Sequence, residues 1–117
     1  VSQSQHRERE LAASYRDLEA QVAQDVRDAY SSASTALRQA LYIRDDLLPA
    51  AREAYRSTAA SYAIGGTSAF EVIDARRTLL AAESQYADAL ASANTSRSDL
   101  ERAVSVPLST IAPGTNP

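Results

Sequence analysis

The feature that most constrains this chain is a series of apolar residues that recur every three or four positions through the first half of the sequence. Alternating steps of three and four place side chains on one face of an α-helix, whereas a strand needs a two-residue repeat. A stripe sustained over so many turns is typical of coiled-coil-like packing, because a single long helix cannot bury its own stripe. The series consists of Leu11, Tyr15, Leu18, Val22, Val26, Ala29, Ala33, Leu37, Ala40, Leu47, Ala51, Tyr55, Ala59 and Tyr62.

Pro49 lies inside this periodic segment. An interior proline removes one backbone hydrogen bond and crowds the preceding turn, so we expect a kink near Asp45–Leu48. The alternative is a complete break, with Asp45-Asp46 capping a new helix and Pro49 in its first turn. The kink is favoured because the apolar spacing resumes in phase at Ala51 and Tyr55.

Residues 64–68 carry a stop signal and a start signal for helices. Gly65 can adopt the left-handed conformation that ends a helix. Three residues separate Ser68 from Glu71, the spacing of a capping box, in which each side chain accepts a backbone N–H of the other. Two such signals so close together predict an antiparallel helical hairpin.

The return helix is marked by a seven-residue repeat, with Leu90 and Val104 expected on the neighbouring seam. We therefore predict an all-α chain with one hairpin domain over residues 1–104: a helix at about 8–63, a turn at 64–68 and a helix at about 69–104. Residues 105–117, rich in Pro, Gly, Thr and Asn, are expected to form an extended or disordered tail. The repeat consists of Val72, Leu79, Tyr86, Ala93 and Leu100.

Composition narrows the class of function further. The net charge is −3 with interspersed signs, which argues against nucleic acid and anionic membrane surfaces as partners. Cysteine is absent, which excludes disulfides and thiolate metal sites, and no apolar run is long enough to span a membrane. No nucleophile–base pair, phosphate loop or metal-binding pattern is present, so we expect neither an enzyme nor a cofactor.

The segment from Tyr62 through Arg77 resembles the signature of TolC-like outer-membrane efflux proteins. That signature is a tyrosine, a glycine three residues later, a short turn, and then an acid, two apolar residues, Asp and Ala, matched here by Glu71-Val72-Ile73-Asp74-Ala75. Leu47-Leu48-Pro49 is similar to the heavy-metal branch of the family. The chain departs from the family at Ser105, where a glycine is usual, at Thr67, where some members have an arginine, and at Gly66, which is expected to loosen the turn.

The resemblance implies a function and a location. Family members have two such hairpins and four membrane strands in each subunit, so this chain resembles a fragment containing the second hairpin. They assemble as homo-trimers whose hairpins form a hollow α-barrel in the periplasm. The hairpin tips meet a periplasmic adaptor protein, which links the channel to an inner-membrane pump. The resemblance therefore implies the periplasmic portion of an outer-membrane channel, with membrane contact only through parts absent from this chain.

Two groups of candidate site residues follow from this resemblance. In the family, the turn docks the adaptor, which implicates Tyr62, Ile64, Gly65, Gly66, Thr67 and Ser68; from spacing alone, ordinary turn chemistry explains these residues better. Acids at positions matching Glu71 and Asp74 line the pore entrance in the family, although acids are stabilised by any helix N-terminus. A ring of carboxylates would attract cations into the pore.

The remaining residues of interest have plainer interpretations. His6 is the only histidine and lacks cysteine partners, and Arg76-Arg77 fits a solvated helix face or an interhelical ion pair better than a phosphate site. The alternative function is a coiled-coil scaffold or oligomerisation module without a role in transport. Such a module prefers Leu, Ile and Val at its seam, whereas this stripe contains much alanine.

Overall fold

The structure is a computed structural model that describes residues 2–111, with side chains described through residue 105. These residues form α1 (Ser2–Tyr42), a π-helical turn η1 (Ile43–Leu47), α2 (Leu48–Ala63) and α3 (Ala69–Ile111), and they contain no strand. The predicted all-α helical hairpin is therefore confirmed.

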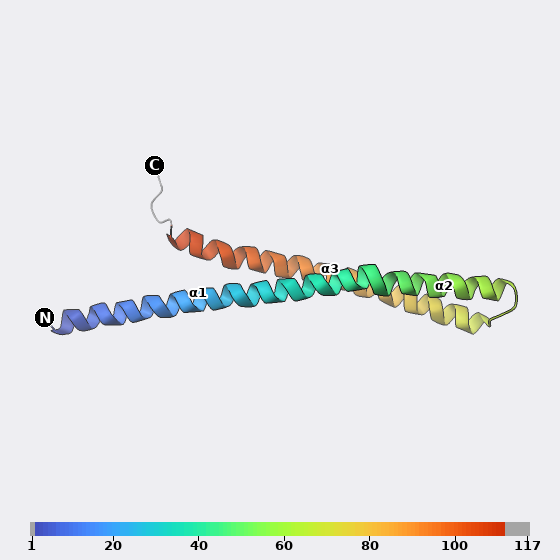
Figure 1. Cartoon of the computed structure of the whole chain (residues 1–117), viewed down its shortest axis with the longest axis horizontal. Helices are drawn as coiled ribbons and strands as arrows, with labels where there is room; N and C mark the ends of the chain where they lie inside the picture. Colours follow the sequence, from blue (N-terminus) through green and yellow to red (C-terminus); the bar gives the residue numbers. More distant parts are fainter. Residues whose placement is uncertain (1, 112–117) are drawn as a thin grey trace, which may run out of the picture. The chain divides into compact units, whose positions relative to one another are not determined.

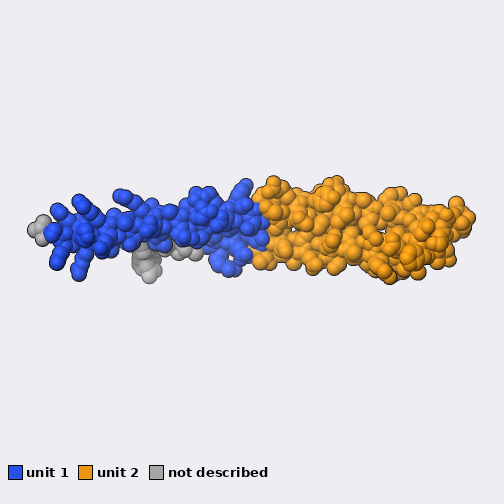
Figure 2. Space-filling view, turned by 90° about the horizontal axis from the view of Figure 1, so that it is seen from below, with its two compact units in different colours: residues 1–33, 96–117 blue, residues 34–95 orange. Residues whose placement is uncertain are grey.

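The chain divides into two compact units, which Figure 2 colours separately. Residues 34–95, here called the tip unit, contain the end of α1, η1, α2, the connecting turn and the first part of α3. Residues 1–33 and 96–117, here called the distal unit, contain the rest of α1 and α3. Each unit is described by itself below.

In the tip unit, α2 and the first part of α3 lie side by side and are joined by a short loop (Figure 1). Their contact is a cluster of buried residues, Leu48, Ala51 and Ala82, against which Leu47, Leu79 and Tyr86 pack. Ala40 and Ile43 are also buried, each with 4% of its surface exposed. The core of this unit is therefore a narrow seam in which alanine alternates with larger residues.

The seam of α3 follows a regular three-and-four spacing. All members of the predicted seven-residue repeat are half-buried, as expected for an inward face. The neighbouring inward positions are small residues: Ala75, Ala82, Ala89, Ser96 and Ala103. The prediction that Leu90 and Val104 occupy this second seam is wrong, since each is 44% exposed. Small side chains at these positions let two helix backbones approach closely. Leu90 and Val104 lie on the flank of the seam instead.

Near Pro49, the first helix neither breaks nor restarts. Leu47 and Leu48, which flank the start of α2, both keep right-handed helical dihedral angles, and the Leu48 N–H donates to the carbonyl of Ile43 five residues earlier. The irregularity expected at Asp45–Leu48 is therefore a π-helical turn. Such a turn accommodates Pro49, which has no N–H to donate to the carbonyl four residues before it.

The π turn also carries an exposed ion pair. Arg44 Nε donates to Asp45 Oδ1 at 2.8 Å and Nη2 donates to Oδ2 at 3.2 Å. The hydrogen bond from the guanidinium lowers the pKa of the Asp45 carboxyl and raises that of Arg44. Because both side chains are exposed to solvent, this pair contributes little to stability.

In the distal unit, the two helices pack more loosely. Val22, Val26, Ala29 and Ala33 of α1 are only half-buried, and no side chain described in this unit is fully buried. Closer to the N-terminus, the predicted stripe continues but is open to solvent. Leu11, Tyr15 and Leu18 are 62%, 63% and 53% exposed. The stripe of α1 therefore lacks a packing partner there among the described residues.

The end of α3 differs from the sequence expectation. We expected an extended tail from Ser105, but the helix continues to Ile111. The physical reason is that Ser105 does not supply the stop that a glycine would give, and its hydroxyl donates to the Arg102 carbonyl at 3.0 Å within the helix. Residues 112–117 of the predicted tail lie outside the described residues.

Candidate functional site at the hairpin turn

The turn begins with a tightly hydrogen-bonded helix end. The Gly66 N–H donates to the Ser61 carbonyl at 2.8 Å, and the Gly65 N–H donates to the Tyr62 carbonyl at 3.0 Å. This pair of bonds is a Schellman motif, and it satisfies carbonyls that a helix end would otherwise leave unpaired. The motif needs a left-handed residue, and Gly65 supplies it with φ of +80°. The role predicted for Gly65 in closing the helix therefore matches its geometry.

Gly66 has a different reason to be glycine. A Cβ at this position would lie 2.6 Å from Ser61 Oγ and 3.3 Å from the Ser61 carbonyl oxygen. The first distance is shorter than a van der Waals contact, so a side chain here would require the Ser61 hydroxyl to rotate away. The missing side chain of Gly66 leaves room for the Ser61 hydroxyl at the end of α2. The expectation that Gly66 loosens the turn stays a prediction.

The second half of the turn is held by two hydroxyl groups. Thr67 Oγ1 donates to the carbonyl of Thr58 at 3.1 Å and so links the loop back to α2. Ser68 Oγ accepts the Glu71 N–H at 3.4 Å, which is the first of the two bonds of the predicted capping box. The Glu71 side chain is exposed and does not bond back to Ser68. Both ends of the loop are therefore attached to a helix.

Apolar side chains project from this constrained turn. Ile64 is 86% exposed, so it contributes little to packing within the tip unit, and Tyr62 is 50% exposed. Phe70, in the first turn of α3, is 76% exposed. Our sequence reasoning did not include Phe70 among the site residues. Its signal was that the only phenylalanine of the chain directly follows the turn, where a buried core residue is not expected.

The two predicted acids lie beside this apolar surface. Glu71 and Asp74 are exposed, and neither takes part in an ion pair with another residue described in the structure. Together with Phe70 they line a shallow groove between α2 and α3. The rest of its lining is small: Ala54, Thr58, Ala75 and Thr78. The structure thus brings the two acids together with the turn, at one end of the hairpin.

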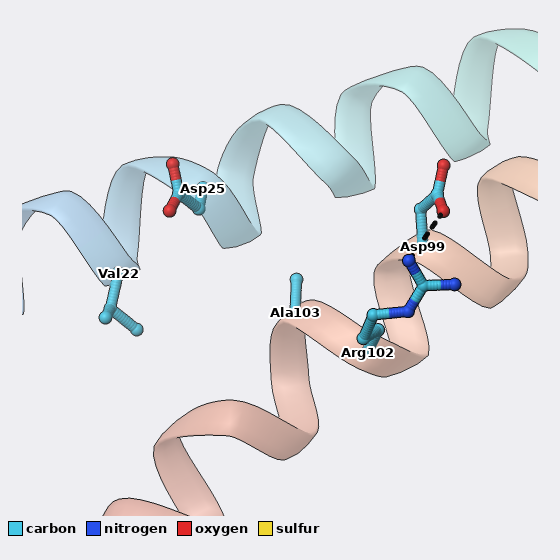
Figure 3. Close-up of a pocket in the computed structure, with 5 residues that line it drawn as sticks. All are labelled: Val22, Asp25, Asp99, Arg102 and Ala103. Atoms are coloured by element: carbon cyan, nitrogen blue, oxygen red, sulfur yellow. Dashed lines mark ion pairs between the residues drawn. The ribbon is translucent and has the colours of Figure 1, made fainter.

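Another crevice lies in the distal unit between α1 and α3 (Figure 3). Val22 and Asp25 line it from α1, and Asp99, Arg102 and Ala103 line it from α3. Arg102 Nη1 lies 3.8 Å from Asp99 Oδ1 on the same helix, which makes an exposed ion pair. The sequence analysis placed Val22 in the apolar stripe but did not single out Asp25, Asp99 or Arg102, because charged residues like these are typical of a solvated helix face.

Between residues 2 and 111, no three His, Cys, Asp or Glu side chains gather as potential metal ligands. His6 is exposed near the start of α1. None of the described helices is both long and apolar enough to cross a membrane.

Comparison with known proteins decides the family. The family of outer membrane efflux proteins (OEP) matches residues 1–105, which is most of the chain. The chain belongs to this family. No curated protein and no solved structure matches it. The TolC-like resemblance is confirmed, and this efflux protein chain is a component of an outer-membrane channel, a class that transports its substrates.

The Schellman motif of this efflux protein chain makes a prediction about Gly65. Gly65→Ala places a Cβ in a left-handed conformation, which costs roughly 1–2 kcal/mol. Gly65→Asn should cost less, because asparagine tolerates this conformation better than other residues with a side chain. Thermal unfolding followed by circular dichroism should give the highest melting temperature for the wild type, a lower one for Gly65→Asn and the lowest for Gly65→Ala. Equal melting temperatures for the two variants would contradict the assigned role of Gly65.

Proposed function

We propose that this chain forms part of the periplasmic wall of an outer-membrane efflux channel, and that its hairpin turn docks a periplasmic adaptor protein. Through the adaptor, the channel would connect to an inner-membrane pump, and three copies would close the barrel. Membership of the efflux family supports the channel role. The docking role is a separate proposal that depends on the turn.

The observation that carries the docking proposal is the exposure of apolar side chains on a constrained loop. Ile64 and Phe70 are 86% and 76% exposed, although the backbone around them is fixed by hydrogen bonds at both ends of the loop. A rigid loop binds with a smaller entropic cost than a flexible one, and exposed apolar side chains at its apex can insert into a partner. Neither residue is needed to hold the two helices together.

The nature of the seam favours a barrel wall over a simple coiled-coil scaffold. Alternate inward positions of α3 are occupied by Ala75, Ala82 and Ala89 rather than by leucine or isoleucine. Meanwhile Leu80 is 54% exposed on an outward face. Leu37, which the sequence placed on the inward stripe, is 53% exposed and also faces outward. A helix with a small-residue seam on one face and larger apolar residues elsewhere is suited to neighbours on more than one side, as a barrel wall requires.

Glu71 and Asp74 are proposed to line the periplasmic entrance of the pore. Both carboxylates are exposed and unpaired, so they are available to act on ions in solution. Repetition of the pair around a trimer would concentrate negative charge at one level of the pore. Such a ring raises the local concentration of cations and repels anions.

The docking proposal is tested by replacing the apical apolar residues in the intact channel. Ile64→Ser and Phe70→Ser together should weaken binding to the adaptor at least about tenfold, because exposed anchors of this kind dominate interface energies. Channel assembly and thermal stability should stay near wild type, since both side chains are exposed in the tip unit. Binding can be measured by surface plasmon resonance and export by the resistance of cells to pump substrates.

The matched control for this test is Tyr30→Ser. Tyr30 is 65% exposed and belongs to the distal unit, far along the sequence from the turn. It should leave adaptor binding unchanged. Undiminished adaptor binding by the double variant, or equal weakening by the control, would contradict the assignment of the turn as the docking site.

The role of the acids is tested by removing their charge while keeping their shape. Glu71→Gln with Asp74→Asn should lower the preference of the reconstituted channel for cations over anions, because the carboxylates no longer attract cations. The reversal potential in a planar bilayer under a KCl gradient measures this preference. Asp88→Asn, which removes an exposed acid elsewhere on α3, serves as the control. A selectivity that does not change in the double variant would exclude these acids from the pore entrance.

A further inference from the structure

The inward faces of the two arms of the tip unit do not have the same spacing. On α3 the inward positions advance by three and four residues without interruption. On the first arm, the buried residues Ala40 and Ile43 are followed by Leu48 and Ala51. The step from Ile43 to Leu48 is five residues, with half-buried Leu47 packed beside Leu48. Ile43 and Ala51 are thus eight residues apart, one more than the seven of a regular heptad. The first arm therefore contains one surplus residue between these two positions.

The π turn lies at this step. In η1, the Leu48 N–H donates to the Ile43 carbonyl, an i to i−5 bond that holds one more residue than an α-helical turn. Each residue of an α-helix rotates the following chain by about 100°. If the turn were α-helical, Ala50 would take the inward place of Ala51. Instead, Ala50 is exposed and Ala51 is 7% exposed.

Two causes could produce this π turn. The first is local: Pro49 cannot donate to the carbonyl of Asp45, and the wider turn removes the conflict. The second is packing: the residues before and after the turn must both face α3, and a regular α-helical turn would not place them so. The residues at its two ends, Ile43 and Leu48, are 4% and 5% exposed, whereas residues 44–46 between them are exposed. A turn imposed only by the proline has no reason to keep both flanks buried.

The corrected register also extends to the hairpin turn. Ten residues after Leu48, Thr58 is half-buried beside α3, and its carbonyl accepts the Thr67 hydroxyl at 3.1 Å. Without the surplus residue, Ser57 would take this inward position. The π turn in the middle of the first arm therefore decides which residue of α2 anchors the loop.

We propose that the π turn at Ile43–Leu47 corrects the register of the first arm against α3. The turn accommodates one extra residue, so that the end of α1 and α2 present one continuous seam to α3. The corrected register also places Thr58 on the inward face, where its carbonyl accepts the hydrogen bond from Thr67 that fixes the hairpin turn. This inference concerns the hairpin itself and does not depend on what the turn binds.

The test uses single-residue deletions in the chain carrying Pro49→Ala, which removes the local cause. The Pro49→Ala chain should retain the π turn, as seen by crystallography or by NMR, because the sequence is still one residue too long for the seam. Deletion of exposed Asp46 should then convert the turn into regular α-helix with Leu48, Ala51 and Thr58 still facing α3. Its melting temperature should stay within about 5 °C of the Pro49→Ala chain.

The matched control deletes Asp88, an exposed aspartate of α3, in the same background. The α3 helix has no π turn, so this deletion rotates half of its seam away from the first arm, and the melting temperature should fall by more than about 10 °C. The proposal is overturned if the Pro49→Ala chain becomes uninterrupted α-helix. It is equally overturned if the two deletions lower the melting temperature to the same extent.

Discussion

The rest of the structure depends on the close contact of small side chains along the seam between the two arms. Ala40, Ala51 and Ala82 are among the few buried residues, and each brings only a methyl group to the interface. Burial of one methylene-sized group contributes about 0.8 kcal/mol, so such a seam holds the arms near one another without supplying the stability of a broad core. Larger apolar residues, including Leu37 and Leu80, remain on outward faces. In the proposed barrel, neighbouring copies would cover these outward faces.

Different interactions fix the hairpin turn and the π turn of the tip unit. At the turn, backbone hydrogen bonds and the Thr67–Thr58 link fix the loop, so its exposed Ile64 is presented on a rigid base. In the middle of the first arm, side-chain burial dominates, and the backbone adopts a π turn to satisfy it. The two turns are coupled, because the register set at η1 determines that Thr58 reaches the loop.

Features with a local chemical cause could be predicted from the sequence, and features that depend on comparing two helices could not. Gly65 and Ser68 mark the turn because one supplies a left-handed residue and the other a helix cap, and both requirements can be recognised in a few residues. The π turn was missed because the spacing around Pro49 looked in phase until the inward face of α3 was known. The place of Leu90 was wrong for a similar reason: hydrophobicity alone does not tell a close seam from its flank. Phe70 was missed although the start of α3 at Ala69 was predicted, because the sequence does not show that a large apolar side chain in the first turn of the helix stays exposed.

The central claim is that the seam leaves outward apolar faces that need neighbouring copies. Sedimentation velocity of the chain over a range of micromolar concentrations tests this claim most directly. The account predicts reversible self-association, with the sedimentation coefficient rising as concentration increases. A chain that stays a folded monomer across the whole range would contradict it.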